Sequence, residues 1–115
     1  MFLDIKDTPR KFKVGNVEIK DFGKISLNEN EMLSFKTSSN KEYDFTAKEW
    51  GFYASPSINS RVKNEGFKTA LVMNEFNKIY IMVVEMEKID KFKEYLKDNQ
   101  DNRVICWLDE FFKEE

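Results

Sequence analysis

The chain lacks the residue on which most protein active sites depend. None of its 115 residues is histidine. This absence excludes Ser-His-Asp and Cys-His nucleophile activation, His-ligated zinc and the facial iron triad. Carboxylates alone can hold a hard cation such as Mg²⁺, but no spacing of Asp and Glu here resembles a calcium loop. We therefore predict no catalytic residues, no metal and no cofactor.

Two further patterns contain a side chain that could act as a nucleophile. Ser60 and Lys63 match the S-x-x-K pattern, in which a lysine on the next helical turn helps to activate a serine. The S-D-N and K-T-G elements that accompany this pattern in penicillin-recognising enzymes do not occur. Cys106, the only cysteine, alternates with Val104 and Leu108, which is typical of a buried structural thiol. Neither pattern predicts catalysis.

The segment from Trp50 to Arg61 has the composition of a recognition site. It is rich in aromatic, hydroxyl and small side chains, whereas its surroundings are rich in Lys and Glu. Aromatic rings can stack on a sugar or a base, and a guanidinium group can bind a carboxylate or phosphate through two hydrogen bonds. If Ser55 and Pro56 begin a helix, free backbone N–H groups there would attract an anion. The candidate ligand-binding residues are Trp50, Tyr53, Ser55, Ser57, Asn59 and Arg61.

A purely structural interpretation of the same segment is equally coherent. Phe52 and Ile58 would then belong to the core, Ser55 and Pro56 would start a helix, and Trp50 would pack at an edge. A second aromatic group, Trp107 with Phe111 and Phe112, could dock on the core or make a dimer contact.

Charge and cysteine content restrict the possible partners and the location. The formal net charge is -2 and opposite charges are interspersed, which disfavours binding to nucleic acid. One cysteine cannot form an intrachain disulfide. Charged residues interrupt the first twelve positions, and no uncharged window is long enough for a membrane span. We therefore expect a cytoplasmic location, with no membrane and no nucleic-acid partner.

Strand patterns dominate the first half of the chain. Residues 12–14 and 17–19 flank Gly15-Asn16, a two-residue hairpin signal with glycine where positive φ is needed. Strands are also expected at residues 24–27 and 32–36, and at Tyr43 and Phe45 after the turn at 37–40. This order predicts a β meander.

Helix signals appear in the second half. Ser55, Pro56 and Gly66 suit the start and end of a short helix at about residues 56–65. The apolar runs at 67–73 and 79–85 predict a central hairpin. Ile89, Phe92 and Leu96 have helical spacing, which predicts the main helix at about 87–99. A strand at 103–108 and a last helical turn within 109–115 should follow.

Length and element order together predict the fold class. A chain of 115 residues has the usual size of one domain, and we predict a single α+β domain over residues 1–115. Its sheet should be mainly antiparallel and curled, built as a meander. One amphipathic helix covers only one sheet face, so a barrel-like curl or a homodimer partner could cover the other.

Three classes of function are consistent with these features. The first is a non-catalytic binding or accessory module that recognises a small polar or anionic ligand, or a protein partner, through residues 50–61. The second is a homodimeric structural or interaction protein. The third is a small histidine-free enzyme, such as an isomerase or lyase, that uses Asp, Glu, Tyr or Lys for proton transfer.

Overall fold

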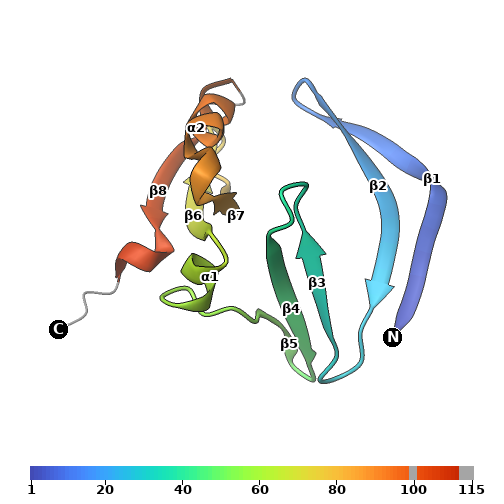
Figure 1. The fold of residues 1–115 in the computed structure, drawn as a ribbon. Helices are drawn as coiled ribbons and strands as arrows, with labels where there is room; N and C mark the ends of the chain where they lie inside the picture. The colour runs from blue at the N-terminus through green and yellow to red at the C-terminus, as the bar shows by residue number, and fades with distance from the viewer. Residues whose placement is uncertain (99–100, 112–115) are drawn as a thin grey trace. The chain divides into compact units, whose positions relative to one another are not determined.

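The structure, a computed structural model, describes residues 1–98 and 101–111 of the chain. Its strands form three sheets with mainly antiparallel pairing, and its longest described helix comes late in the chain (Figure 1). The chain divides into two compact units, one of Met1–Ser34 with Asp44–Ser55 and one of Phe35–Tyr43 with Pro56–Glu115. The α+β class is confirmed, and the single domain stays a prediction.

The first unit begins with a long β hairpin. It consists of β1 (Phe2–Val14) and β2 (Val17–Ser26), which pair antiparallel. The turn at Gly15-Asn16 lies where it was predicted, and Gly15 has the positive φ, 60°, that the turn requires. Both strands continue far beyond the predicted segments, so most of the strand expected at 24–27 is the end of β2.

The register of this hairpin changes near its middle. Ile5 pairs with Gly23 and Arg10 pairs with Asp21, so the stretch 6–9 of β1 bulges out opposite Phe22. An extra stretch on one strand interrupts the ladder and increases the local bend. Since Asp21 and Gly23 both lie on the unbulged strand, β2 keeps a regular alternation of faces through this region.

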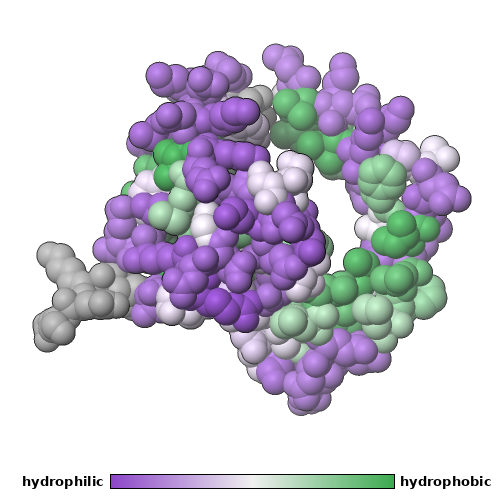
Figure 2. All heavy atoms as spheres, viewed as in Figure 1, coloured by the Kyte–Doolittle hydropathy of each residue, from purple (hydrophilic) through white to green (hydrophobic). Residues whose placement is uncertain are grey.

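Apolar side chains gather on one face of the β1–β2 hairpin. Cross-strand pairs such as Leu3 with Ile25 and Phe12 with Ile19 place their side chains on the same face, because directly opposed residues share a face. Figure 2 shows hydrophobic residues along this hairpin. We call this the hairpin face, and its large apolar members are Leu3, Ile5, Phe12, Val14, Val17, Ile19 and Ile25.

A second sheet has the strand order β3-β4-β5. Its strands are β3 (Met32–Lys36), β4 (Glu42–Lys48) and β5 (Gly51–Ala54). β3 and β4 match the predicted meander, whereas β5 was not predicted. The unit boundaries fall within β3, within β4 and one residue after the end of β5.

The third sheet, with order β7-β6-β8, lies in the second unit. The predicted central hairpin is confirmed as β6 (Phe67–Met73) and β7 (Ile79–Glu85). The predicted main helix is α2 (Ile89–Asp98), preceded by the 3₁₀ turn η1 (Met86–Lys88). β8 (Arg103–Trp107) and the 3₁₀ turn η2 (Leu108–Phe111) complete the unit. Residues 99, 100 and 112–115, which include Phe112, lie outside the described residues.

The core of the second unit consists of two clusters. Ala70 and Val72 of β6 pack with Leu96 of α2, and all three are almost fully buried. Phe92 and Trp107 pack against them and meet edge to face, with ring centroids 5.8 Å apart. The other cluster contains the buried residues Tyr43, Val62 and Phe67.

A one-residue irregularity in β8 changes which side chains face this core. Val104 pairs with Val72, but Cys106 pairs with Leu71, so Ile105 is an extra residue between them. Val104 therefore shares the face of Val72 and α2, whereas Cys106 lies on the other face. The predicted alternation of Val104 with Cys106 is wrong because this bulge interrupts it, and the thiol is half-buried.

Two further predictions need correction. The short helix expected at 56–65 is only one turn, α1 (Arg61–Asn64), because Pro56 to Ser60 form bends and turns. A barrel-like sheet is not supported, because the described strands form three separate open sheets. No helix among the described residues is long and apolar enough to cross a membrane.

Candidate functional site

The six residues predicted to bind a ligand are divided between the two units. Trp50, Tyr53 and Ser55 belong to the first unit, whereas Ser57, Asn59 and Arg61 belong to the second. The candidates therefore form two groups of three, one in each unit.

Trp50 and Tyr53 form an exposed aromatic pair on the β4–β5 hairpin. Trp50 lies in the turn between the strands and is 73% exposed. Tyr53, in β5, pairs with Thr46 and stacks on Trp50, with ring centroids 6.3 Å apart and planes inclined by 28°. Phe52, which the structural interpretation placed in the core, is 68% exposed. This hairpin therefore presents aromatic rings to solvent on both faces.

Ser55 has a structural role at the end of this hairpin. Its backbone N–H donates to the carbonyl oxygen of Asp44 at 3.0 Å. Its hydroxyl lies 2.6 Å from the hydroxyl of Thr46. Both groups of Ser55 are thus engaged in closing β4 onto β5.

Ser57 lies four residues before the start of α1 and accepts hydrogen bonds from its first backbone N–H groups. Its hydroxyl accepts the backbone N–H of Arg61 at 3.0 Å, and its carbonyl accepts the N–H of Val62 at 2.9 Å. Asn59 and Arg61 are exposed beside it. Because α1 has only four residues, the expected anion site at a helix start is not formed.

β5 is also the edge strand of its sheet, so its backbone is available for contact beside the aromatic pair. The hydrogen bond from Ser55 N–H to the Asp44 carbonyl shows that these two residues form a hydrogen-bonded pair of β4 and β5. Hydrogen-bonded and non-hydrogen-bonded pairs alternate along antiparallel strands, so Phe52 and Ala54 belong to non-hydrogen-bonded pairs. The N–H and C=O groups of Phe52 and Ala54 therefore point away from β4, toward the open edge. Such an edge can pair with another extended segment.

A different part of the second unit holds a shallow groove. Its volume is about 350 Å³, and it lies between the first turns of α2 and the edge strand β7. We call it the α2–β7 groove. It is lined by Thr37, Phe67, Met82, Val83, Val84, Glu85, Lys88, Lys91, Phe92 and Tyr95.

Glu85 is fixed at one end of the α2–β7 groove by three partners. Its carboxylate pairs with Lys88 Nζ at 3.0 Å and accepts hydrogen bonds from the hydroxyls of Thr37 at 2.9 Å and Ser39 at 3.5 Å. The hydrogen bond from Lys88, with the further hydroxyl bonds, lowers the pKa of Glu85 below its ordinary value. Lys88 also donates to Ser39 at 2.7 Å, so Glu85, Lys88 and Ser39 form a closed hydrogen-bond network.

Among the residues that the structure describes, Lys91 has no comparable partner. Within residues 1–98 and 101–111 it makes no ion pair, although it lines the groove one helical turn beyond Lys88. Sequence reasoning missed this site, although the spacing of Lys88, Lys91 and Tyr95 on one helix face was visible. The missing information was that their face of α2 lies beside the apolar edge of β7.

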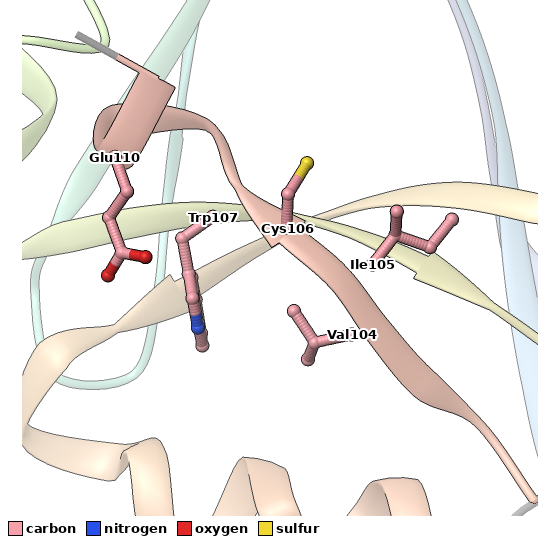
Figure 3. Close-up of a pocket in the computed structure, with 5 residues that line it drawn as sticks. All are labelled: Val104, Ile105, Cys106, Trp107 and Glu110. Carbon is pink, nitrogen blue, oxygen red and sulfur yellow. The ribbon is translucent and has the colours of Figure 1, made fainter.

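A second hollow of about 470 Å³ runs along the edge strand β8. Figure 3 shows that its side chains do not converge: Val104 and Trp107 extend to one side of the strand, whereas Cys106 and Ile105 extend to the other. Glu110 also lines the hollow and pairs with Lys68, whose Nζ lies 3.2 Å from its carboxylate and 4.7 Å from the centre of the Trp107 ring. This hollow follows the edge of β8, and its side chains do not converge on one point.

Carboxylates with shifted pKa values are held as anions. A hydrogen bond from the Gly23 N–H, with a further bond from Arg10, lowers the pKa of Asp21. The N–H of Asn28 does the same for Glu31. A general acid needs the opposite shift. In the part of the chain that the structure describes, no three Cys, Asp or Glu residues lie close enough to hold a metal ion.

Comparisons with family models, with curated proteins and with solved structures found no match to this chain.

Proposed function

We propose that this chain is a non-catalytic binding module that recognises a protein partner through the β4–β5 hairpin. The observation that supports this function most strongly is the exposed stacked pair of Trp50 and Tyr53 beside the open edge of β5. Trp and Tyr are enriched among the residues that dominate binding energy at protein interfaces. Neither the α2–β7 groove nor the β8 hollow is lined by these rings, so a broad protein surface suits them better than a small ligand.

The open edge specifies how such a partner would bind. An extended segment can add to β5 as a new strand, with hydrogen bonds to the backbone of Phe52 and Ala54. Side chains of the segment would then contact Tyr53 on one face and Phe52 on the other. Backbone pairing supplies affinity in this mode, and the flanking rings supply specificity.

Binding measurements with a purified partner test this function. Proteins captured by the immobilised chain would be identified and purified, and their dissociation constants measured by calorimetry. We expect Tyr53→Ala and Trp50→Ala each to weaken binding by about tenfold or more, the scale of an interface hot spot. Phe76→Ala is the matched control, because Phe76 is a 63% exposed aromatic residue in a turn of the second unit.

Strand addition is tested by a separate variant. Ala54→Pro removes one outward N–H group from the edge and leaves the aromatic rings in place. We expect it to weaken binding without a loss of thermal stability. Equal affinity of every captured protein for the wild type, Tyr53→Ala and Trp50→Ala would refute recognition by this hairpin.

A different observation favours a second function, that of a homodimeric structural protein. The seven large apolar side chains of the hairpin face are each between 38% and 54% exposed. A two-stranded hairpin is at best marginally stable alone and gains stability when its apolar face is covered. A second copy presents an identical face, and a stable dimer buries about 800 Å² on each partner.

Light scattering with paired variants tests the dimer. We expect Ile19→Lys, on the hairpin face, to shift a dimer to monomer. Phe22→Lys should leave the mass unchanged, because Phe22 is also exposed but occupies the alternate face of β2. A wild-type mass that stays monomeric at all concentrations would exclude this function.

A further inference from the structure

The α2–β7 groove combines an apolar floor with a cationic rim. Met82 and Val84, on the sheet face that packs against α2, form the floor together with Phe92 of α2, and Phe67 lines the groove from the opposite sheet face. Phe67 and Val84 are buried. We propose that this groove binds an amphipathic anion, namely an aliphatic carboxylate of medium chain length, with its chain on the floor and its head group at Lys91. Binding here does not require the proposed recognition by the β4–β5 hairpin.

The arrangement of charges determines the sign of the ligand. Glu85 and Lys88 neutralise each other through their 3.0 Å contact. Lys91 is then the charge left without an opposite partner among the described groove residues. A carboxylate beside Lys91 would gain an ion pair, whereas a cationic head group would be repelled. Among amphipathic ligands, the rim therefore selects for an anion.

The position of Lys91 on the helix fits this role. Lys88, Lys91 and Tyr95 are spaced three and four residues apart, so they occupy one face of the helical segment. Phe92 lies next to Lys91 and packs against the core cluster, which orients the helix over β7. A flexible lysine stem can extend along apolar surface and keep its ammonium group in water.

The volume sets the length of the ligand. A groove of about 350 Å³ lies at the lower end of the range for small-molecule sites. At about 30 Å³ per heavy atom, the share of a water molecule in the liquid, it holds about a dozen atoms. Decanoate has this size. Affinity should rise about fourfold for each methylene group added up to this length, because each buried methylene contributes a constant transfer free energy.

Titration with decanoate tests the proposal on the full chain at neutral pH. Calorimetry would give the affinity, and two-dimensional NMR would locate binding from the amide signals of Val83, Glu85 and Lys91. Decan-1-ol, with the same chain and no charge, is the ligand control. We expect decanoate to bind more tightly than decan-1-ol by about three- to fivefold, as for an exposed ion pair.

Two lysine variants separate this site from general surface charge. Lys91→Gln should remove the preference for decanoate over decan-1-ol. Lys93→Gln should keep it, because Lys93 is exposed on α2 and does not line the groove. Absence of saturable decanoate binding would overturn the proposal. Equal effects of the two variants, or shifted amide signals confined to residues outside the groove, would overturn it as well.

Discussion

Asp21 lies opposite Arg10 across the β1–β2 hairpin and links it to the backbone two residues further along β2. One carboxylate oxygen accepts from Arg10 Nη2 at 3.1 Å, and the other accepts the N–H of Gly23 at 3.0 Å. The pair sits where the register changes. Since the bulge leaves ladder groups unpaired, this carboxylate replaces part of the lost strand pairing.

Asp21→Asn should lower the melting temperature by a few degrees at most, because exposed ion pairs contribute little. The amide keeps an oxygen that can accept from Gly23 but loses the charge that attracts Arg10. Differential scanning calorimetry checks this. Lys20→Gln on the same strand is the control, since the Lys20 side chain makes no hydrogen bond or ion pair with the residues that the structure describes. Equal melting temperatures of Asp21→Asn and this control would show that the Arg10 contact adds no stability.

Gly23→Ala should destabilise the chain more than Gly51→Ala. Both glycines have φ in a region that L side chains rarely adopt, +135° and +142°. A Cβ at Gly23 would also overlap the carbonyl oxygen of Asp4, whereas a Cβ at Gly51 meets nothing within 4 Å. The φ strain costs about 1 kcal/mol or more in each case. Denaturant melts give the loss of unfolding free energy for each variant, and the difference between the two losses measures the overlap with Asp4. Equal losses would argue against the β1–β2 register at Gly23.

Acid should weaken the fold through Glu85. Its folded pKa lies below the ordinary value of 4.5 because of Lys88, so the unfolded chain takes up a proton at higher pH than the folded chain. The stabilisation is therefore complete above about pH 5 and is lost as the pH falls through the folded pKa. Thermal melts from pH 7 to pH 3 should show a steeper decline for the wild type than for Glu85→Gln. Parallel curves would contradict this contribution.

Cys106 should react with a thiol reagent in the native state. The β8 bulge places it on the sheet face away from α2, where it is half-buried. The exchanged variant with Val104→Cys and Cys106→Val carries its thiol on the face packed against Leu96. We expect labelling of this variant to be slower by about tenfold or more, because it requires local opening. Equal rates would mean that β8 continues without a bulge.

Leu96→Ala should cost about 2 to 5 kcal/mol of unfolding free energy, the usual range for a leucine in a packed core. Leu96 is 6% exposed and packs between Ala70 and Val72. Lys97→Ala, its exposed neighbour on α2, should change the unfolding free energy by less than about 0.5 kcal/mol. Urea melts of both variants provide the measurement. A similar small loss for both would place α2 elsewhere.

Elements with strong local signals were predictable from the sequence. The Gly15-Asn16 turn, the two apolar runs of β6 and β7, and the helical spacing of Phe92 and Leu96 each determine their own structure. In these segments the local pattern and the tertiary packing agree.

Features that depend on long-range pairing were not predictable. The extra residue Ile105 leaves no trace in the sequence, since the run from Val104 to Trp107 is apolar on both faces of β8. The helix signal at Ser55 and Pro56 was overridden, because Ser55 closes β4 onto β5 instead. The aromatic residues of segment 50–61 were selected from composition, but their arrangement on an edge strand required the strand order.

The open sheets also bear on colloidal behaviour. Each terminal strand of an open sheet exposes backbone groups that can template pairing with another molecule, so association competes with solubility at high concentration. Lysines interrupt the β1–β2 hairpin, at positions such as Lys11, Lys13 and Lys20, and charged side chains are a common protection against such pairing. β5 contains no charged residue between Gly51 and Ala54. This short strand is therefore where uncontrolled aggregation of the folded protein should begin.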